Sequence, residues 1–201
     1  MFATLHCVTT QTSEADAWAE AREGSSRAFA LLFDLYYDRV FRHIAGLADQ
    51  RADADEICGA AFLELWRHRS RVRVVNGSVL PWLLVTASNL ARNHGRKTMR
   101  YRQVLRALPR DPEPRDAAEI VEAREDGARR SASLRSAIAQ LKPIDAQLLD
   151  LTGREGLPVQ VAAEAVGITP GAARVRLHRA RAQLRDRLGP DFEPCYSTRE
   201  N

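Results

Sequence analysis

The chain has 201 residues, of which 28% are charged and only 6% aromatic, and its formal net charge is +4. This length allows one large or two small folded domains, and the abundance of Ala, Leu and Arg in its periodic segments favours helices over sheets. Neither a secretory leader nor a run of 18 apolar residues is evident, so we expect an all-α, cytoplasmic protein without membrane insertion.

Cysteine and histidine usage argues against a metal site, a disulfide framework or an enzyme. Cys7, Cys58 and Cys195 are far apart and odd in number, which predicts reduced thiols and neither zinc nor any other cofactor. The sequence lacks the phosphate-binding, dinucleotide-binding, metalloprotease and serine-hydrolase motifs. For the five histidines we expect solvated or packing roles: His6, His43, His68, His94 and His178.

The first half of the chain predicts two amphipathic helices. Residues 28–48 carry apolar side chains at spacings of three and four, and residues 52–69 repeat this pattern. The second helix opens with acids and closes with bases, which suits the helix dipole. The two apolar stripes consist of Phe29, Leu32, Phe33, Tyr36, Val40 and Ile44, and of Ile57, Ala61, Phe62, Leu65 and Trp66.

A turn and a third, basic helix follow. Asn76-Gly77 predicts a turn within residues 72–80, and Pro81 is a plausible first residue of the next helix. That helix begins apolar, and we expect Trp82 to pack in the core rather than stack on a base. Residues 92–106 hold six lysines and arginines and no acid, as a helix that follows a nucleic-acid backbone requires.

Residues 107–127 reverse this composition. They contain three prolines, and seven acids stand against three arginines. Such a segment with few large apolar residues is typical of a linker. Two roles stay open for it: a flexible tether, or a strand of negative charge that occupies a basic channel of a partner.

The remainder predicts four short helices, the last two forming a helix-turn-helix. Pro143, Pro158 and Pro170 stand at expected helix starts, and Gly153, Gly156 and Gly167 lie near expected helix ends. In the last helix a narrow apolar stripe leaves arginines on most of the remaining surface. A solvated basic helix is the plain alternative, but the preceding helix and glycine turn favour binding in the major groove of DNA.

Residues 141–184 resemble region 4 of bacterial sigma factors of the extracytoplasmic-function group. The letters RLHRAR at 176–181 are identical to those of the family's "PxGTVKSRLHRAR" helix. The resemblance implies that this helix reads the −35 promoter element. Ala172 and Val175 replace residues that often carry hydroxyls, which indicates an altered base preference. The residues assigned to the −35 element are Arg174, Val175, Arg176, His178, Arg179 and Arg181.

The first half resembles region 2 of the same family. DADEICGAAFLELWRHR, at 53–69, is similar to "DAEDLVQETFLRAWRHR", which grips the clamp helices of the polymerase β′ subunit, and 81–97 is similar to the helix that melts and reads the −10 element. The resemblance assigns polymerase binding to Asp53, Asp55, Glu56, Ile57, Phe62, Leu65 and Trp66. To the −10 element we assign Asn76, Ser78, Ser88, Asn89, Arg92, Asn93, Arg96, Lys97 and Arg100.

One departure from the family pattern lies in the polymerase-binding helix. Cys58-Gly59-Ala60-Ala61 stands where the family has Val-Gln-Glu-Thr, which removes an amide and an acid from the polymerase-facing surface. Gly59 inside a helix also costs roughly 1 kcal/mol. We therefore expect weaker core affinity or the use of other contacts.

The resulting prediction is a promoter-specificity subunit built from two helical domains with a flexible linker. It would bind core RNA polymerase through the β′ clamp helices and the β flap, recognise promoter DNA, and be a target for an anti-sigma factor. A stand-alone helix-turn-helix regulator that binds an operator is the alternative. The chain divides into an N-terminal extension at 1–25, region 2 at 26–106, an acidic linker at 107–130, region 4 at 131–188 and a tail at 189–201.

Overall fold

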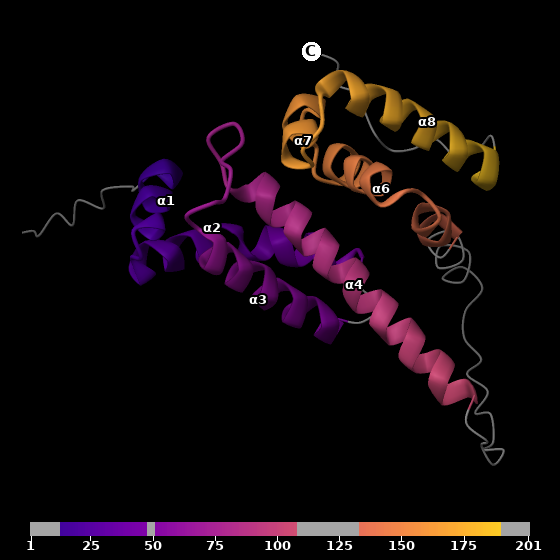
Figure 1. Cartoon of the computed structure of the whole chain (residues 1–201), viewed down its shortest axis with the longest axis horizontal. Coiled ribbons are helices and arrows are strands. Elements are labelled where there is room, and N and C mark those ends of the chain that lie inside the picture. Colours follow the sequence, from indigo (N-terminus) through magenta and orange to yellow (C-terminus); the bar gives the residue numbers. More distant parts are fainter. Residues whose placement is uncertain (1–12, 48–50, 108–132, 190–201) are drawn as a thin grey trace, which may run out of the picture.

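The computed structural model describes residues 13–47, 51–107 and 133–189, with the side chains of residue 51 and of 102–107 left aside. These parts of the chain are helical apart from short connections, which confirms the all-α prediction (Figure 1). None of the helices among them is long and apolar enough to span a bilayer. The expected linker and tail fall largely on 108–132 and 190–201, outside the described residues.

Two capped helices open the described chain. α1 (Glu14–Arg22) and α2 (Ser26–Ala45) each follow a serine whose hydroxyl accepts a backbone N–H of the first turn: Ser13 from Asp16 and Ser25 from Ala28. The expected N-terminal extension thus includes a helix whose Trp18 is buried in the same core as α2. The stripe predicted for α2 is confirmed, with Leu32, Val40 and Ile44 fully buried.

α3 (Arg51–His68) and α4 (Leu80–Ala107) complete the first bundle. The turn predicted between them is confirmed, because Asn76 and Gly77 have φ values of 52° and 75° and Val75 pairs with Ser78 in an isolated bridge. Two positive φ values in succession suit Asn-Gly better than almost any other pair. Trp82 packs against the core, as expected.

The second bundle contains a helical stretch at 133–139, α6 (Pro143–Leu149), α7 (Val159–Ala165) and α8 (Pro170–Leu188). Pro143 and Pro170 begin their helices and Pro158 caps α7, as predicted. Gly153 lies near the end of the helical stretch that begins at Pro143, as predicted, because that stretch ends at Arg154. It lies inside a π-helical turn, η1 (Asp150–Arg154), in which the Glu155 N–H donates to the Asp150 carbonyl, five residues back.

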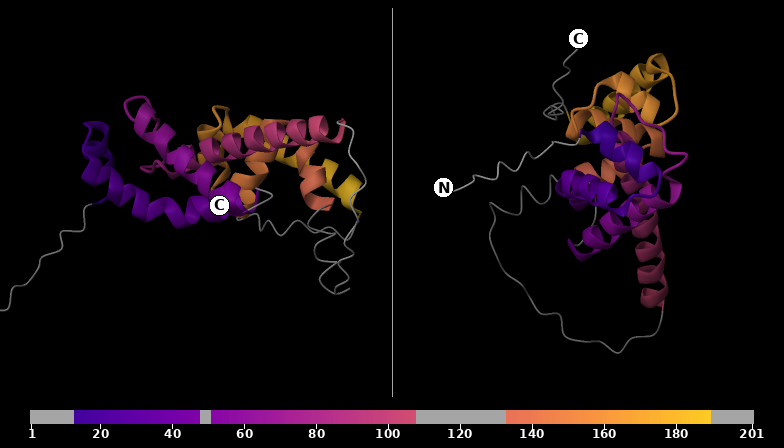
Figure 2. Two further views of the ribbon diagram at one scale, coloured as in Figure 1. Left: turned by 90° about the horizontal axis from the view of Figure 1, so that it is seen from below. Right: turned by 90° about the vertical axis from the view of Figure 1, so that its left-hand side faces the viewer.

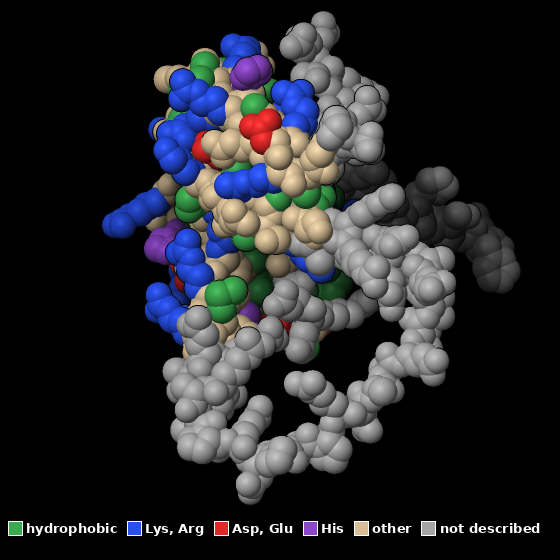
Figure 3. Space-filling view, turned by 90° about the vertical axis from the view of Figure 1, so that its right-hand side faces the viewer, with side chains coloured by type: hydrophobic (Ala, Val, Ile, Leu, Met, Phe, Trp, Pro, Cys, Tyr) green, Lys and Arg blue, Asp and Glu red, His purple; other side chains and the backbone are tan. Residues whose placement is uncertain are grey.

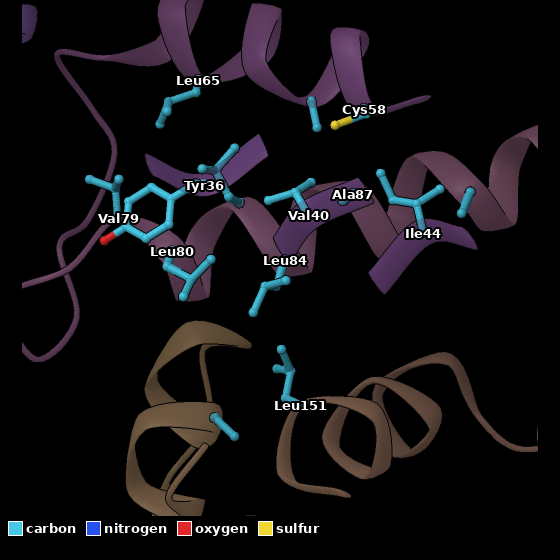
Figure 4. Packing of buried hydrophobic residues seen from close by; sticks show 14 of the residues in the cluster. Tyr36, Val40, Ile44, Cys58, Leu65, Val79, Leu80, Leu84, Ala87 and Leu151 are labelled. Carbon is cyan, nitrogen blue, oxygen red and sulfur yellow. The ribbon is translucent and has the colours of Figure 1, made fainter. Parts of the chain in front are cut away.

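The two bundles share one apolar core. A single cluster of buried side chains runs from α1 through α4 into η1, α7 and α8. Figure 4 shows Leu84 of α4 and Leu151 of η1 facing each other across the junction, and both are buried. The views of Figures 1 and 2 agree that the second bundle lies beside α4. α4 is therefore a structural element of both bundles.

Candidate nucleic-acid interface

The helix-turn-helix consists of α7, a tight turn and α8. Gly167 adopts a φ of +77°, and the Thr169 hydroxyl caps α8 by accepting the Ala172 N–H at 3.3 Å. Ala173, Leu177, Ala180 and Leu184 are buried against the bundle, which confirms the predicted apolar stripe. Packing of this stripe fixes the orientation of α8 and turns its other faces outward.

Four of the six residues predicted to read the −35 element are exposed on α8: Arg174, Val175, His178 and Arg179. Arg176 and Arg181 are half-buried instead. Arg176 donates to the Asp145 carboxylate of α6 at 2.8 Å, so it also ties α8 to the helix beneath. The structure thus distinguishes four open side chains from two half-buried ones, of which Arg176 bonds to a neighbouring helix.

Most of the basic residues predicted to read the −10 element line a groove between α3 and α4. This groove, of about 420 Å³, has Ile57, Ala60 and Leu90 on its apolar side. Ala60 stands where the family pattern has glutamate, so the small residue leaves this wall uncharged. The polar and charged lining consists of Glu56, Asn93, His94, Arg96, Lys97 and Arg100.

A basic surface connects the two predicted reading helices. Figure 3 shows Lys and Arg side chains gathered along one edge of the molecule, from α8 at the top toward α4 below, with few acids among them. On α4 the exposed cations are Arg96, Lys97 and Arg100, and on α8 they include Arg174, Arg179 and Arg185. A surface of this kind suits the phosphate backbone of a nucleic acid.

Three other residues assigned to the −10 element lie at or near the junction of the two bundles. Ser88 is buried and its hydroxyl is 2.8 Å from His43 Nε2, while Asn89 accepts a hydrogen bond from Gln147 of α6 at 2.6 Å. Arg92 is half-buried, and burial lowers the pKa of its guanidinium. The nearby negative charge of Asp150 acts in the other direction and raises this pKa, but by less. These three side chains are engaged within the protein.

The loop that carries Asn76 and Ser78 is braced from two sides. The Val79 N–H donates to the Glu14 carboxylate at 2.9 Å, and the Tyr36 and Ser78 hydroxyls are 3.1 Å apart. Burial, followed by hydrogen bonding to Glu14, raises the pKa of Tyr36, so its hydroxyl stays protonated. Asn76 is exposed at the tip, whereas the Ser78 hydroxyl already has partners.

The residues assigned to polymerase binding fall into two groups on α3. Ile57, Phe62 and Leu65 are buried core residues. The ring of Trp66 packs against that of Phe29, with 5.0 Å between the ring centroids. The acids face outward: Glu56 is exposed, and Asp55, also exposed, accepts the Tyr37 hydroxyl at 3.0 Å. Asp53 lies 3.4 Å from His94 of α4. Polymerase contact by this set stays a prediction.

Sequence reasoning missed a cluster at the junction of the bundles. His43 is fully buried and contacts Glu155 and Asp150 of the second bundle. The available signal was its spacing of seven residues from Tyr36, which places His43 on the apolar stripe of α2 and so predicts its burial. The part of the chain that the structure describes holds no group of His, Cys, Asp and Glu side chains suited to a metal ion.

Comparison with known protein families matches both bundles. Residues 131–184 match the family described as Sigma-70, region 4, and residues 32–101 match Sigma-70 region 2. RNA polymerase sigma factor CarQ of Myxococcus xanthus is 32% identical over 168 residues, which cover 84% of this chain and 93% of CarQ. The ECF RNA polymerase sigma factor BldN of Streptomyces coelicolor is 30% identical, and the match covers 85% of this chain and 64% of BldN.

Solved structures share the fold. CnrH in complex with the cytosolic domain of CnrY matches with a TM-score of 0.58 and 21% identity, covering 89% of this chain and 99% of CnrH. The sigma factor RpoE of Bartonella quintana, in complex with the anti-sigma factor NepR, matches with a TM-score of 0.52 and 17% identity, covering 82% and 98% of the two chains. The arrangement of helices in both bundles therefore has counterparts among solved structures.

Proposed function

We propose how the two bundles divide the work of promoter recognition in this chain, which belongs to the extracytoplasmic-function group of the sigma-70 family. A member of this family directs RNA polymerase to promoters, and that is the function of this protein. Like other members, it catalyses no reaction itself. Its bundles are region 2 (α1–α4) and region 4 (residues 133–188), and its site of action is the cytoplasm, where transcription occurs.

Region 4 reads the −35 element through α8. Arg174, Val175, His178 and Arg179 enter the major groove, because they are exposed near the capped start of the helix. Arg176 and Arg181 contact the backbone from the flank. Val175, at 50% exposure, offers an apolar contact such as a thymine methyl, in place of a hydroxyl.

Region 2 opens and reads the −10 element. Arg96, Lys97 and Arg100 follow the backbone of the separated strand, and the exposed Asn76 receives an extruded base. Capture of unstacked bases offsets the few kcal/mol that unstacking costs. Ser78, Ser88, Asn89, Arg92 and Asn93 complete the proposed −10 set.

α3 forms the contact to the clamp helices of the polymerase. Asp53, Asp55 and Glu56 supply charge at its exposed start, while Ile57, Phe62, Leu65 and Trp66 hold it in the bundle. Gly59 is exposed and Ala60 is half-exposed, where the family pattern has glutamine and glutamate. The surface at these two positions therefore carries no polar side chain. Region 4 would contact the β flap, and an anti-sigma factor would compete with polymerase for these surfaces.

The observation that carries this proposal is the presence, in one chain and in family order, of both regions with a basic surface that connects their reading helices. The test is run-off transcription by purified bacterial core polymerase, with and without the protein, on a library of upstream regions from the source genome. Start sites that appear only with the protein support the proposal, and their aligned upstream sequences give both elements.

A different result would favour the stand-alone regulator. That class of protein binds duplex DNA tightly without polymerase, usually as a dimer on paired half-sites. If no start site depends on the protein, and the protein alone shifts duplex DNA, the promoter-subunit proposal fails.

A further inference from the structure

The junction between the two regions is built around a buried histidine. His43 of α2 is fully buried, and its Nδ1 lies 2.9 Å from Glu155 Oε1 of region 4. Its Nε2 lies 2.8 Å from the Ser88 hydroxyl and 3.4 Å from Asp150 Oδ2. Both ring nitrogens thus face groups that bind an N–H, and two of these groups are carboxylates from the other region.

Two arginines extend the network in opposite directions across the junction. Arg39 of α2 donates from Nε to the Glu155 carboxylate and from Nη2 to the Glu155 carbonyl, both at 3.0 Å. Arg154 of η1 donates to the His43 carbonyl at 3.0 Å and pairs with Asp150 at 3.2 Å. We name the whole set the His43 clasp: Arg39, His43, Ser88, Asp150, Arg154 and Glu155.

The π-helical turn places the region 4 side of the clasp. Asp150, Arg154 and Glu155 belong to η1 or follow it directly, and all three contact α2. π-Helical turns are rare, and they occur frequently at functional sites. An uncommon backbone conformation therefore lies where the two regions meet.

The clasp closes over the part of α4 assigned to the −10 element. Ser88 is bonded to His43, Asn89 to Gln147 of region 4, and Arg92 is half-buried near Asp150. The neighbouring Asn93, Arg96, Lys97 and Arg100 stay open along the groove. Of these side chains Asn89 bonds directly to region 4, and it cannot receive a promoter base at the same time.

We propose that this structure is a closed state, in which the His43 clasp holds region 4 over the −10 surface of α4 and excludes the separated promoter strand. This inference rests on the proposed function, because it assigns the regulation of the same site. A buried network of charges suits such a state, since loss of one partner leaves another charge buried and uncompensated. A local change at the clasp can therefore release the whole junction.

The test measures the distance between the regions and the promoter activity in the same full-length variants. Fluorescent donor and acceptor dyes are attached at Ser70→Cys in region 2 and Gln183→Cys in region 4, both exposed positions. Cys7 and Cys195 are replaced by serine, while the buried Cys58 remains. Energy transfer reports closure without polymerase, and single-round transcription at limiting protein reports promoter opening.

The main variant is Glu155→Lys, which places a cation against Arg39 and His43. We expect energy transfer to fall and transcription at limiting protein to rise about fivefold or more, as for a typical coupling between sites. Arg39→Ala removes the other partner of the ion pair, and we expect it to change both readouts in the same direction. Because this side chain is 39% exposed, the variant tests the clasp even if Glu155→Lys fails to fold. Arg39→Glu combined with Glu155→Lys restores the ion pair in reverse, and we expect both readouts to return toward wild type.

Glu164→Lys is the matched control, because it makes the same charge change at an exposed position of region 4. Energy transfer that stays unchanged in both Glu155→Lys and Arg39→Ala would overturn the clasp. A fall in transfer without a gain in transcription, or the same gain in Glu164→Lys, would overturn its control of promoter access. If even the wild type directs no transcription, the proposed function fails, and the transfer measurement still decides whether the clasp closes the chain.

Discussion

The two helices that read DNA differ in how much of their reading surface is open. On α8, Arg174, Val175, His178 and Arg179 are exposed, and the helix is held from its opposite, apolar face. On α4, Asn89 bonds to Gln147 of the other region, and Arg92 is half-buried near Asp150. Ser88 is buried against His43 within its own region, while the following turns are open. The −35 surface is therefore ready for duplex DNA in the closed state, whereas the −10 surface becomes complete only after region 4 moves.

The largest effect is expected where the two regions share a core. Leu151→Ala removes a buried side chain at the junction, and we expect the free energy of unfolding to fall by about 2–5 kcal/mol. Urea denaturation followed by circular dichroism measures this loss. Leu184→Ala, buried within region 4, should cost a similar amount but leave energy transfer between the regions unchanged. A Leu151→Ala loss below about 1 kcal/mol would show that the regions do not share a core.

The difference in exposure between the two reading helices gives the second prediction. Arg174→Ala should weaken binding to the −35 element by about 1–3 kcal/mol. Because Arg174 is exposed in the closed state, this loss should be the same in wild type and in Glu155→Lys. Arg92→Ala should cost more promoter activity in the Glu155→Lys background, where the side chain is free to meet DNA.

Double-mutant cycles on promoter activity measure this difference. The Arg174 and Glu155 substitutions should be additive within about 0.5 kcal/mol, whereas those at Arg92 and Glu155 should not be. Additivity in both pairs contradicts the unequal exposure of the two helices.

A smaller effect concerns the glycine of α3. Gly59→Ala should raise the free energy of unfolding by roughly 1 kcal/mol, because glycine is unfavourable inside a helix. A Cβ at this exposed position would meet no neighbouring group within 4 Å in the described structure. Gly77→Ala is the contrasting control, since Gly77 has a φ of +75° and alanine is strained there. Thermal denaturation of the two variants should shift in opposite directions.

The smallest expected effect is the reactivity of Cys58. Burial, with a lesser contribution from Asp55, raises the pKa of its thiol to about 11. The native thiol should resist alkylation at pH 8 in the Cys7→Ser, Cys195→Ser chain, and react once urea unfolds the protein. Because the unfolded thiol loses its proton first as pH rises, this group lowers stability between pH 9 and about 11. Rapid labelling of the native chain at pH 8 contradicts the burial of this face of α3.

Local rules predicted the helices well because their signals are local. Pro143 and Pro170 start helices since proline lacks the N–H that a first turn leaves unpaired, and Asn76-Gly77 forms the turn that its conformational freedom allows. The apolar stripe of α8 likewise followed from spacing alone. The exposed part of the −35 set was therefore visible in the sequence.

The closed junction was not visible, because it joins residues more than a hundred positions apart. The pairing of His43 with Glu155 leaves no trace in the periodicity of either segment. The π-helical turn at Asp150–Arg154 was also missed, since the apolar spacing predicts a helix there but not the hydrogen-bond pattern of its last turn. The sequence indicated which residues suit DNA but not which of them region 4 covers.

The π-helical turn also makes the closed arrangement sensitive to chain length. A hydrogen bond that spans five residues accommodates one residue more than the α-helical bond. This turn therefore sets the rotation, about the helix axis, of the chain that follows α6. Inserting one further residue at 150–154, which the turn cannot accommodate, would rotate the following chain by about 100° and lengthen it by about 1.5 Å. Glu155 would then point away from Arg39 while α7 and α8 kept their own packing. A one-residue length difference here would thus uncouple the regions without removing a single side chain that reads DNA.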